Sequence, residues 1–221
     1  MHDDHDDHGH AGGGDPHAPI RDAGAGGWFE RRAEAIQALL VEKGILSADE
    51  VRRQVEEMDG KGVHNGARIV ARAWVDQAFK TRLLADARAA VAELGLDAGT
   101  VADLAAVENT EQVHHVIVCT LCSCYPRAIL GRPPDWYKSL TYRRRAVRDP
   151  RAVLREFGLE LPASVEVRVV DSTADLRYMV LPKRPAGTEG MSEAALAALV
   201  TRDSLIGVTE VAPPGRSGRA A

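Results

Sequence analysis

The chain of 221 residues contains three cysteines, and all of them lie within six positions: Cys119, Cys122 and Cys124. A disulfide framework spreads its cysteines along the chain so that they join distant segments, and this cluster joins none. The fold must therefore depend on an apolar core, for which the hydrophobic content of 45% is sufficient. The cluster itself requires a local chemical explanation.

Composition and charge argue against two classes of partner. The formal net charge of -4 gives no bulk attraction to nucleic acid, so no nucleic-acid partner is expected. No stretch of about 18 apolar residues is present, and we therefore expect no membrane-spanning helix. The first residues are mainly His and Asp rather than a basic patch followed by an apolar run, which predicts a cytoplasmic protein without a secretory signal.

The sequence divides into four segments. Residues 1–27 are rich in His, Asp and Gly, bury almost nothing and are predicted to be disordered. This tail holds five of the eight histidines, which fits either loose metal capture or a solubilising tail with no fixed site. Residues 28–63 are predicted to form a helical arm that needs a partner surface, residues 64–210 a folded domain, and residues 211–221 a flexible tail.

Apolar periodicity predicts helices before and after a group of short strands. The expected helices are 28–43, 47–58, 64–94 with a break near Gln77, 135–147, 150–157 and 192–200. The expected strands are 101–108, 113–118, 165–171, 176–181 and a final 206–208, with a turn at Asn109 and Thr110. This order predicts the α+β class: an N-terminal helical arm followed by a layered α-β-β-α domain with mainly antiparallel strands.

The cysteine spacing allows an unusual chelate. If the sulfurs of Cys122 and Cys124 bind one metal, the backbone nitrogens of Ser123 and Cys124 lie between them. Counting bonds, these four atoms close one six-membered and two five-membered rings with the metal. Cys119, three residues earlier, can then supply an axial thiolate and leave the sixth position of an octahedron open.

Such a donor set selects its metal. A peptide nitrogen loses its proton only beside a strongly polarising ion, and trivalent cobalt or iron suits the arrangement. The open position would be a Lewis-acid site, and the layered domain would be a metal-binding domain. Two other interpretations remain: a tetrahedral zinc site with His114 or His115 as fourth ligand, and a redox pair of thiols.

The cysteine segment resembles a known family. Residues 116–126 resemble the metal-binding segment of nitrile hydratase alpha subunits, and further similar stretches extend the resemblance over about 64–208. These stretches are 66–76, 130–131, 133–138, 142–148, 177–182, 184–190 and 200–208.

The resemblance implies a catalytic alpha-subunit domain over 64–210 and a function, the hydration of a nitrile to the amide by a hydro-lyase. Cys119, Cys122 and Cys124 would be thiolate ligands, with backbone amides from Ser123 and Cys124. In the family the position of Cys122 carries a sulfinic acid and that of Cys124 a sulfenic acid, and Cys122, Ser123 and Cys124 would form the catalytic group. Thr120 is typical of cobalt members, which implies non-corrin cobalt(III), with iron(III) as the second choice.

The resemblance also implies partners. A beta subunit would complete a heterodimer or heterotetramer and would hold the oxidised sulfurs with two arginines. An activator protein would insert the metal. Arg177 matches a family arginine that supports the metal ligands from behind, although an ordinary surface strand residue is the alternative interpretation.

One position departs from the family pattern. Arg127 and Ala128 stand where nitrile hydratases usually have Trp-Pro. An arginine at this position resembles the gamma subunit of thiocyanate hydrolase, a related enzyme that produces carbonyl sulfide and ammonia. Arg127 is therefore a candidate pocket residue that would attract an anion, or alternatively a solvated or subunit-facing charge.

Overall fold

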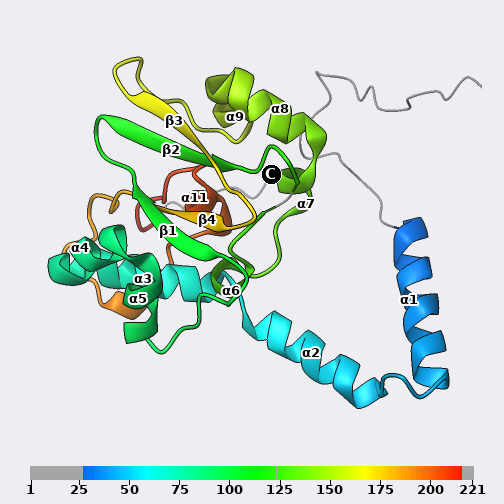
Figure 1. Cartoon of the computed structure of the whole chain (residues 1–221). Helices are drawn as coiled ribbons and strands as arrows, with labels where there is room; N and C mark the ends of the chain where they lie inside the picture. Colours follow the sequence, from blue (N-terminus) through cyan, green and yellow to red (C-terminus); the bar gives the residue numbers. More distant parts are fainter. Residues whose placement is uncertain (1–26, 123, 216–221) are drawn as a thin grey trace, which may run out of the picture.

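The computed structural model describes residues 27–122 and 124–215. The predicted disordered tail, apart from Gly27, lies outside the described residues, as do 216–221 of the predicted C-terminal tail. The chain begins with an arm of two helices, α1 (Gly27–Glu42) and α2 (Ala48–Gly60), which extend away from the body of the molecule (Figure 1). Ser47 and Glu50 form the predicted capping box at the start of α2.

Three helices follow the arm where the sequence predicted two: α3 (Val63–Val75), α4 (Gln77–Ala85) and α5 (Ala87–Glu93). The predicted break near Gln77 is confirmed, and a second break lies at Asp86. The carboxylate of Asp76 accepts the backbone N–H of Phe79, and that of Asp86 accepts the N–H of Ala89. The second break was missed because the apolar pattern continues across Asp86 and only its side chain marks the new helix.

The four main strands lie where they were predicted: β1 (Asp103–Glu108), β2 (Val113–Val118), β3 (Glu166–Asp171) and β4 (Leu176–Leu181). Their pairing was predicted wrongly. β1 pairs with β4 and β2 pairs with β3, and both pairs are parallel. The short connection after β1 crosses from one sheet to the other instead of closing a hairpin, and the long connection after β2 returns the chain in the parallel direction.

Helices cover the two sheets from opposite sides (Figure 1). α4 and α5 contact β1, while α8 (Leu140–Arg148) and α9 (Pro150–Glu156) contact β2 and β3, respectively. Since β2 also contacts β4, the layers run α-β-β-α, as predicted. Two short helices, α6 (Arg127–Leu130) and α7 (Asp135–Lys138), connect β2 to α8. No helix in the described part of the chain is long and apolar enough to cross a membrane.

The predicted helix 135–147 is divided at Ser139, whose hydroxyl caps the first turn of α8. The predicted strand 206–208 is wrong, because residues 202–206 form α11 (Arg202–Ile206), which follows α10 (Glu193–Ala197). Thr201 and Ser204 form a capping box at the start of α11. Gly207 ends α11 in the left-handed conformation, with φ of 85°. A local capping motif and a glycine therefore override a short β-branched pattern.

Gly207→Ala is expected to lower the free energy of unfolding by about 3 kcal/mol or more. An added Cβ would overlap the carbonyl oxygen of His115, and the positive φ would be strained as well. Gly158→Ala is the matched control, since Gly158 has φ of 80° and a Cβ added there would meet nothing within 4 Å, so only the backbone strain of about 1 kcal/mol applies. Urea unfolding of both variants measures the difference, and equal losses would contradict the packing argument.

Candidate metal centre

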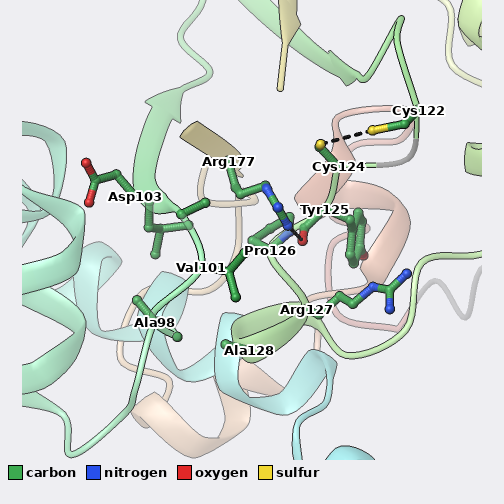
Figure 2. Close-up of a pocket in the computed structure, with 13 residues that line it drawn as sticks. Ala98, Val101, Asp103, Cys122, Cys124, Tyr125, Pro126, Arg127, Ala128 and Arg177 are labelled. Atoms are coloured by element: carbon green, nitrogen blue, oxygen red, sulfur yellow. Dashed lines mark hydrogen bonds between the residues drawn. The ribbon is translucent and has the colours of Figure 1, made fainter. Parts of the chain in front are cut away.

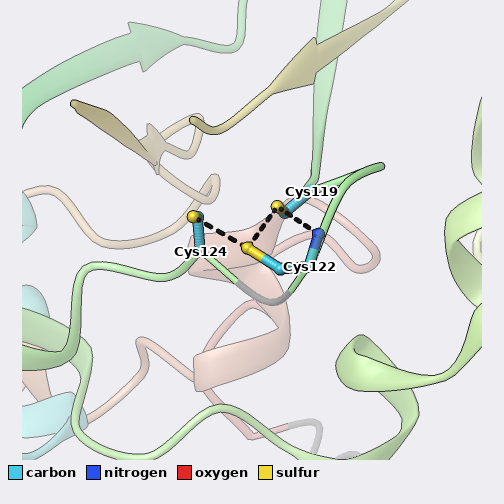
Figure 3. Close-up of side chains that lie close together, drawn as sticks. All are labelled: Cys119, Cys122 and Cys124. Atoms are coloured by element: carbon cyan, nitrogen blue, oxygen red, sulfur yellow. Dashed lines mark hydrogen bonds between the residues drawn. The ribbon is translucent and has the colours of Figure 1, made fainter. Parts of the chain in front are cut away.

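The three cysteines come together in a loop that starts where β2 ends (Figure 3). The sulfur of Cys122 lies 3.6 Å from that of Cys119 and 3.2 Å from that of Cys124. The backbone N–H of Cys122 also donates to the sulfur of Cys119 at 3.3 Å. Cys119 and Cys124 are buried, whereas Cys122 is exposed. Among the described residues this is the one group of His, Cys, Asp or Glu side chains whose ligand atoms converge as a metal site requires.

The sulfur spacing fits one shared ion. Thiolates that bind a metal at about 2.3 Å are about 3.3 Å apart at a right angle and about 3.8 Å apart at a tetrahedral angle. The Cys122–Cys124 separation of 3.2 Å matches the right-angle value. The Cys119–Cys122 separation of 3.6 Å lies between the two. The pair with one intervening residue is therefore spaced as adjacent corners of a square or an octahedron.

The Cys124 thiol does not ionise easily without a cation. Burial raises the pKa of the Cys124 thiol to about 12, and the neighbouring thiols Cys122 and Cys119 contribute to the rise. Three thiolates at this spacing would repel one another strongly, so a multivalent cation is what makes the ionised donor set stable. Ser123, predicted to supply a backbone nitrogen, lies outside the described residues.

The two histidines of β2 do not join the sulfurs. The ring of His114 is buried, and both of its nitrogens are engaged: Nε2 donates to the carbonyl of Gly207 at 2.7 Å, and Nδ1 accepts from the amide of Asn109 at 3.1 Å. His115 lies 3.3 Å from Asn109 through its Nδ1. Neither ring belongs to the described cluster of metal-ligating atoms, which leaves the tetrahedral zinc interpretation without its histidine.

Thr120 joins the cysteine loop to β3. Its backbone N–H and its hydroxyl donate to the two carboxylate oxygens of Asp171, at 2.9 and 2.5 Å. Asp171 is the last residue of β3, directly beside Val118 at the end of β2. The sequence analysis selected Thr120 but missed Asp171. The position of Asp171 at the end of a predicted strand was the available signal. Its contact with Thr120 could not be predicted, because the pairing of β3 with β2 was unknown.

Asp171→Asn is expected to speed metal loss from the assembled protein by about tenfold or more, because charge-assisted hydrogen bonds contribute roughly 1.5–3 kcal/mol. The neutral amide cannot accept both Thr120 donors with the same strength, so the loop becomes less well positioned. Metal release to a chelator measures the effect. Asp175→Asn, a change at an exposed carboxylate in the turn before β4, is the control and should release metal at the wild-type rate. Equal rates for the two variants would exclude a role for Asp171.

An aromatic cluster supports the loop from behind. The hydroxyl of Tyr137 donates to the carbonyl of Cys124 at 2.8 Å, in a buried position. Burial raises the pKa of Tyr137 far above its ordinary value, which keeps the hydroxyl a donor. Its ring packs edge-on against Tyr125 at 5.1 Å. Tyr137 was not selected from the sequence, because nothing local distinguishes a tyrosine that packs in the core from one that also positions a loop.

Arg177 lies on β4 and reaches the same loop. Its guanidinium donates to the carbonyl of Tyr125 at 2.9 Å and to the carbonyl of Thr173 at 3.2 Å. These contacts connect the residue after Cys124 with the turn between β3 and β4. The side chain therefore contacts the cysteine loop and also lines the pocket beside it.

A cavity of about 400 Å³ opens beside the cysteine cluster (Figure 2). Its lining residues come from the cysteine loop and the start of α6 (Cys122, Cys124 and residues 125–128), from the segment that leads into β1 (residues 98–99 and 101–104) and from Arg177 on β4. Arg127, the first residue of α6, lines this cavity and is exposed, and its guanidinium has no hydrogen-bond partner in the described part of the chain. The sequence-based candidates Cys122, Cys124, Arg127 and Arg177 therefore meet at one cavity.

Comparison with known proteins identifies a family and several related sequences. The family model described as nitrile hydratase, alpha chain, matches residues 28–209. The low-molecular-weight cobalt-containing nitrile hydratase subunit alpha of Rhodococcus rhodochrous is 52% identical over 187 residues, which cover 84% of this chain and 90% of that protein. The thiocyanate hydrolase subunit gamma of Thiobacillus thioparus is 45% identical over 198 residues, which cover 85% of this chain and 81% of that protein.

Solved structures agree in fold. A double mutant of the Fe-type nitrile hydratase from Comamonas testosteroni Ni1 superposes with a TM-score of 0.80 at 43% identity, over 90% of this chain and all of that one. A recombinant thiocyanate hydrolase with partially modified cobalt centres gives a TM-score of 0.77 at 44% identity, over 85% of this chain and 91% of that one. With three sulfurs spaced for one metal and a family match over most of its length, the chain belongs to the nitrile hydratase alpha-chain family.

Proposed function

We propose that this chain is the metal-binding catalytic alpha subunit of a cobalt nitrile hydratase, which adds water to a nitrile to give the amide. The observation that carries the proposal is the convergence of three cysteine sulfurs at the edge of a cavity that a small nitrile can enter. A deep cavity beside a reactive group is where small substrates usually bind.

We assign the metal to the thiolates of Cys119, Cys122 and Cys124 and to the backbone nitrogens of Ser123 and Cys124. Cobalt(III) is the proposed ion, supported by Thr120 and by cobalt-containing relatives, with iron(III) as the alternative. When bound, the ion supplies Lewis acidity toward the substrate. We also propose that Cys122 carries a sulfinic acid and Cys124 a sulfenic acid, since both line the cavity and thiols that a metal keeps ionised are the ones that oxidise.

The other residues of the chain position this group. Asp171 and Tyr137 hold the two ends of the cysteine loop, through Thr120 and the carbonyl of Cys124. Arg177 holds the carbonyl of the next residue and lines the cavity. Alanine, valine and proline side chains form much of the remaining wall, and such a surface accepts the apolar part of a nitrile and limits access of bulk water.

A beta subunit is proposed as the partner that completes the cavity. Leu121, at the tip of the cysteine loop, is 86% exposed, and Cys122 beside it is exposed as well. In the proposed division of the chain, residues 28–63 are an arm that contacts this partner, and 64–210 are the catalytic domain between tails 1–27 and 211–221. An activator protein for metal insertion, a heterodimeric or heterotetrameric assembly and a cytoplasmic location belong to the same proposal.

The assembled protein tests this proposal. Metal analysis should find about one cobalt per alpha chain, and the mass of the cysteine peptide should be higher by about 48 Da, for three added oxygens. The complex should convert acrylonitrile to acrylamide without further hydrolysis. Bound zinc with an unmodified cysteine peptide, or a cobalt-loaded complex that leaves nitriles unchanged, would refute the assignment.

Thiocyanate hydrolysis is the second candidate function, and Arg127 is the observation that favours it. A cation among the lining residues attracts an anion strongly, whereas a neutral nitrile gains only a weaker ion–dipole interaction. The same preparation should therefore be assayed with thiocyanate, with ammonia release as the signal. A higher kcat/KM for thiocyanate than for acrylonitrile, reversed in Arg127→Ala, would establish this alternative.

A further inference from the structure

One wall of the cavity is made by a segment without regular secondary structure. Residues 94–102 join α5 to β1, and this segment with the start of β1 supplies six lining residues: Ala98, Gly99, Val101, Ala102, Asp103 and Leu104. Val101 is 81% exposed, so the wall stands at the surface. A loop of this kind has no ladder of backbone hydrogen bonds to hold it, and its position depends on side chains from elsewhere.

Arg88 from α5 holds this wall at three points. Its guanidinium donates to the carbonyl of Gly99 at 2.6 Å, to the carbonyl of Ala102 at 2.6 Å and to the carboxylate of Asp103 at 3.3 Å. A planar guanidinium can engage several acceptors at once without moving, which a lysine ammonium cannot do with the same geometry. Within the described residues, no other side chain donates to the carbonyls of Gly99 or Ala102.

The opposite wall lies close to the same point. A Cβ added at Gly99 would be 3.3 Å from the Cβ of Ala128 in α6, the helix that begins with Arg127. The two walls therefore meet at Gly99 and Ala128, and a shift of Gly99 away from Ala128 would widen the cavity at this point. Two further hydrogen bonds anchor the loop: the carboxylate of Asp97 accepts the N–H of Gly99, and at the start of β1 the N–H of Asp103 donates to the carbonyl of Asp175, which lies just before β4. Neither of them holds the carbonyl side of Gly99.

We propose that Arg88 is a positioning residue that sets the width of the cavity and thereby the size of the nitrile it accepts. We call the three hydrogen bonds from Arg88 to Gly99, Ala102 and Asp103 the clamp. The substrate class in this inference rests on the proposed function, whereas the clamp rests only on these contacts. Arg88 is not itself one of the residues that line the cavity. Its effect is transmitted by the backbone between Gly99 and Asp103.

The test compares Arg88→Ala and Arg88→Lys with wild type in the metal-loaded complex. For acrylonitrile, Arg88→Ala should raise KM about tenfold and leave kcat within about twofold, because a loosened wall weakens substrate positioning without touching the reacting group. For the bulkier benzonitrile the rise should be smaller, so that discrimination by size declines. Arg88→Lys should recover part of the loss, and the cobalt content of all variants should equal that of wild type.

Arg82→Ala is the matched control. Arg82 makes a bidentate ion pair with Glu93 on the same side of the fold and does not line the cavity. It should lower thermal stability slightly and leave both KM values unchanged. Equal kinetics in Arg88→Ala and Arg82→Ala, or a fall of kcat accompanied by metal loss, would overturn the inference.

Hydrogen exchange separates this inference from the proposed function. Amides of residues 97–103 should exchange faster in Arg88→Ala than in wild type and Arg82→Ala, whatever the substrate is. Unchanged amide exchange in Arg88→Ala would contradict the role of Arg88 in holding this loop, even if the complex hydrates nitriles. Faster exchange in a complex that hydrates no nitrile supports the clamp and places the failure in the proposed function.

Discussion

Cys122→Ser in the assembled protein is expected to retain no cobalt and to lose activity by more than about 10³-fold. Cys122 is the central member of the cluster, with its sulfur 3.6 Å from that of Cys119 and 3.2 Å from that of Cys124. A serine hydroxyl is a far weaker donor to a trivalent ion than a thiolate, because its oxygen remains protonated near neutral pH. The variant would also lack the Cys122 sulfur that closes the proposed six-membered chelate ring.

Metal analysis and acrylonitrile turnover measure this effect. Ala163→Ser is the control, since that side chain is exposed in the connection before β3, does not line the cavity and supplies no ligand atom. It should keep the metal and most of the activity. The mass of the cysteine peptide gives an independent signal, because the serine variant cannot carry the oxygens proposed for Cys122. A cobalt-loaded and active Cys122→Ser protein would rule out the ligand assignment.

The double variant Ile36→Asp/Leu39→Asp is expected to weaken binding of the proposed beta subunit by about 100-fold or more. Ile36 is 59% exposed and Leu39 49% exposed on the same face of α1. Each side chain contributes about 1.5–3 kcal/mol if the partner buries it, and a charge placed there adds a desolvation cost. Because both side chains are exposed in the chain alone, its own thermal unfolding should change little.

Sedimentation of the mixed subunits, or titration of one with the other, measures the dissociation constant. Ala38→Asp adds one negative charge, against two in the double variant, on the opposite face of α1, where the residue is also exposed, and should leave the affinity unchanged. Loss of affinity in the control as well would indicate a general effect of charge on the arm. Unchanged affinity in the double variant would show that this face of α1 lies outside the contact.

The parts of the fold that were predicted well depend on local interactions. The strands 113–118 and 176–181 were placed correctly because β-branched and apolar residues are concentrated over a few positions between turns. The start of α2 was predicted because Ser47 and Glu50 are three residues apart. The cysteine cluster was visible for the same reason, since its spacing lies within one short loop.

The errors arose where distant residues decide. The strand order was predicted as mainly antiparallel because two short turns suggested hairpins, whereas the sheets pair β1 with β4 and β2 with β3. Nothing in the turn around Asn109 reveals this. The side chain of Asn109 is buried against His114, and its amide oxygen accepts the backbone N–H of His115, which directs the chain between the layers. Such a contact becomes visible only when the layers are assembled.

The sequence by itself determined the donor atoms of the proposed site, since bond counting across Cys122, Ser123 and Cys124 needs no tertiary information. Only the tertiary structure revealed what surrounds them. Asp171 is 51 residues from Thr120, and Arg177 is 52 residues from Tyr125. The physical reason is that a chelate is closed by covalent geometry within one loop, whereas the walls and supports of a cavity are brought together by the packing of the sheets and helices.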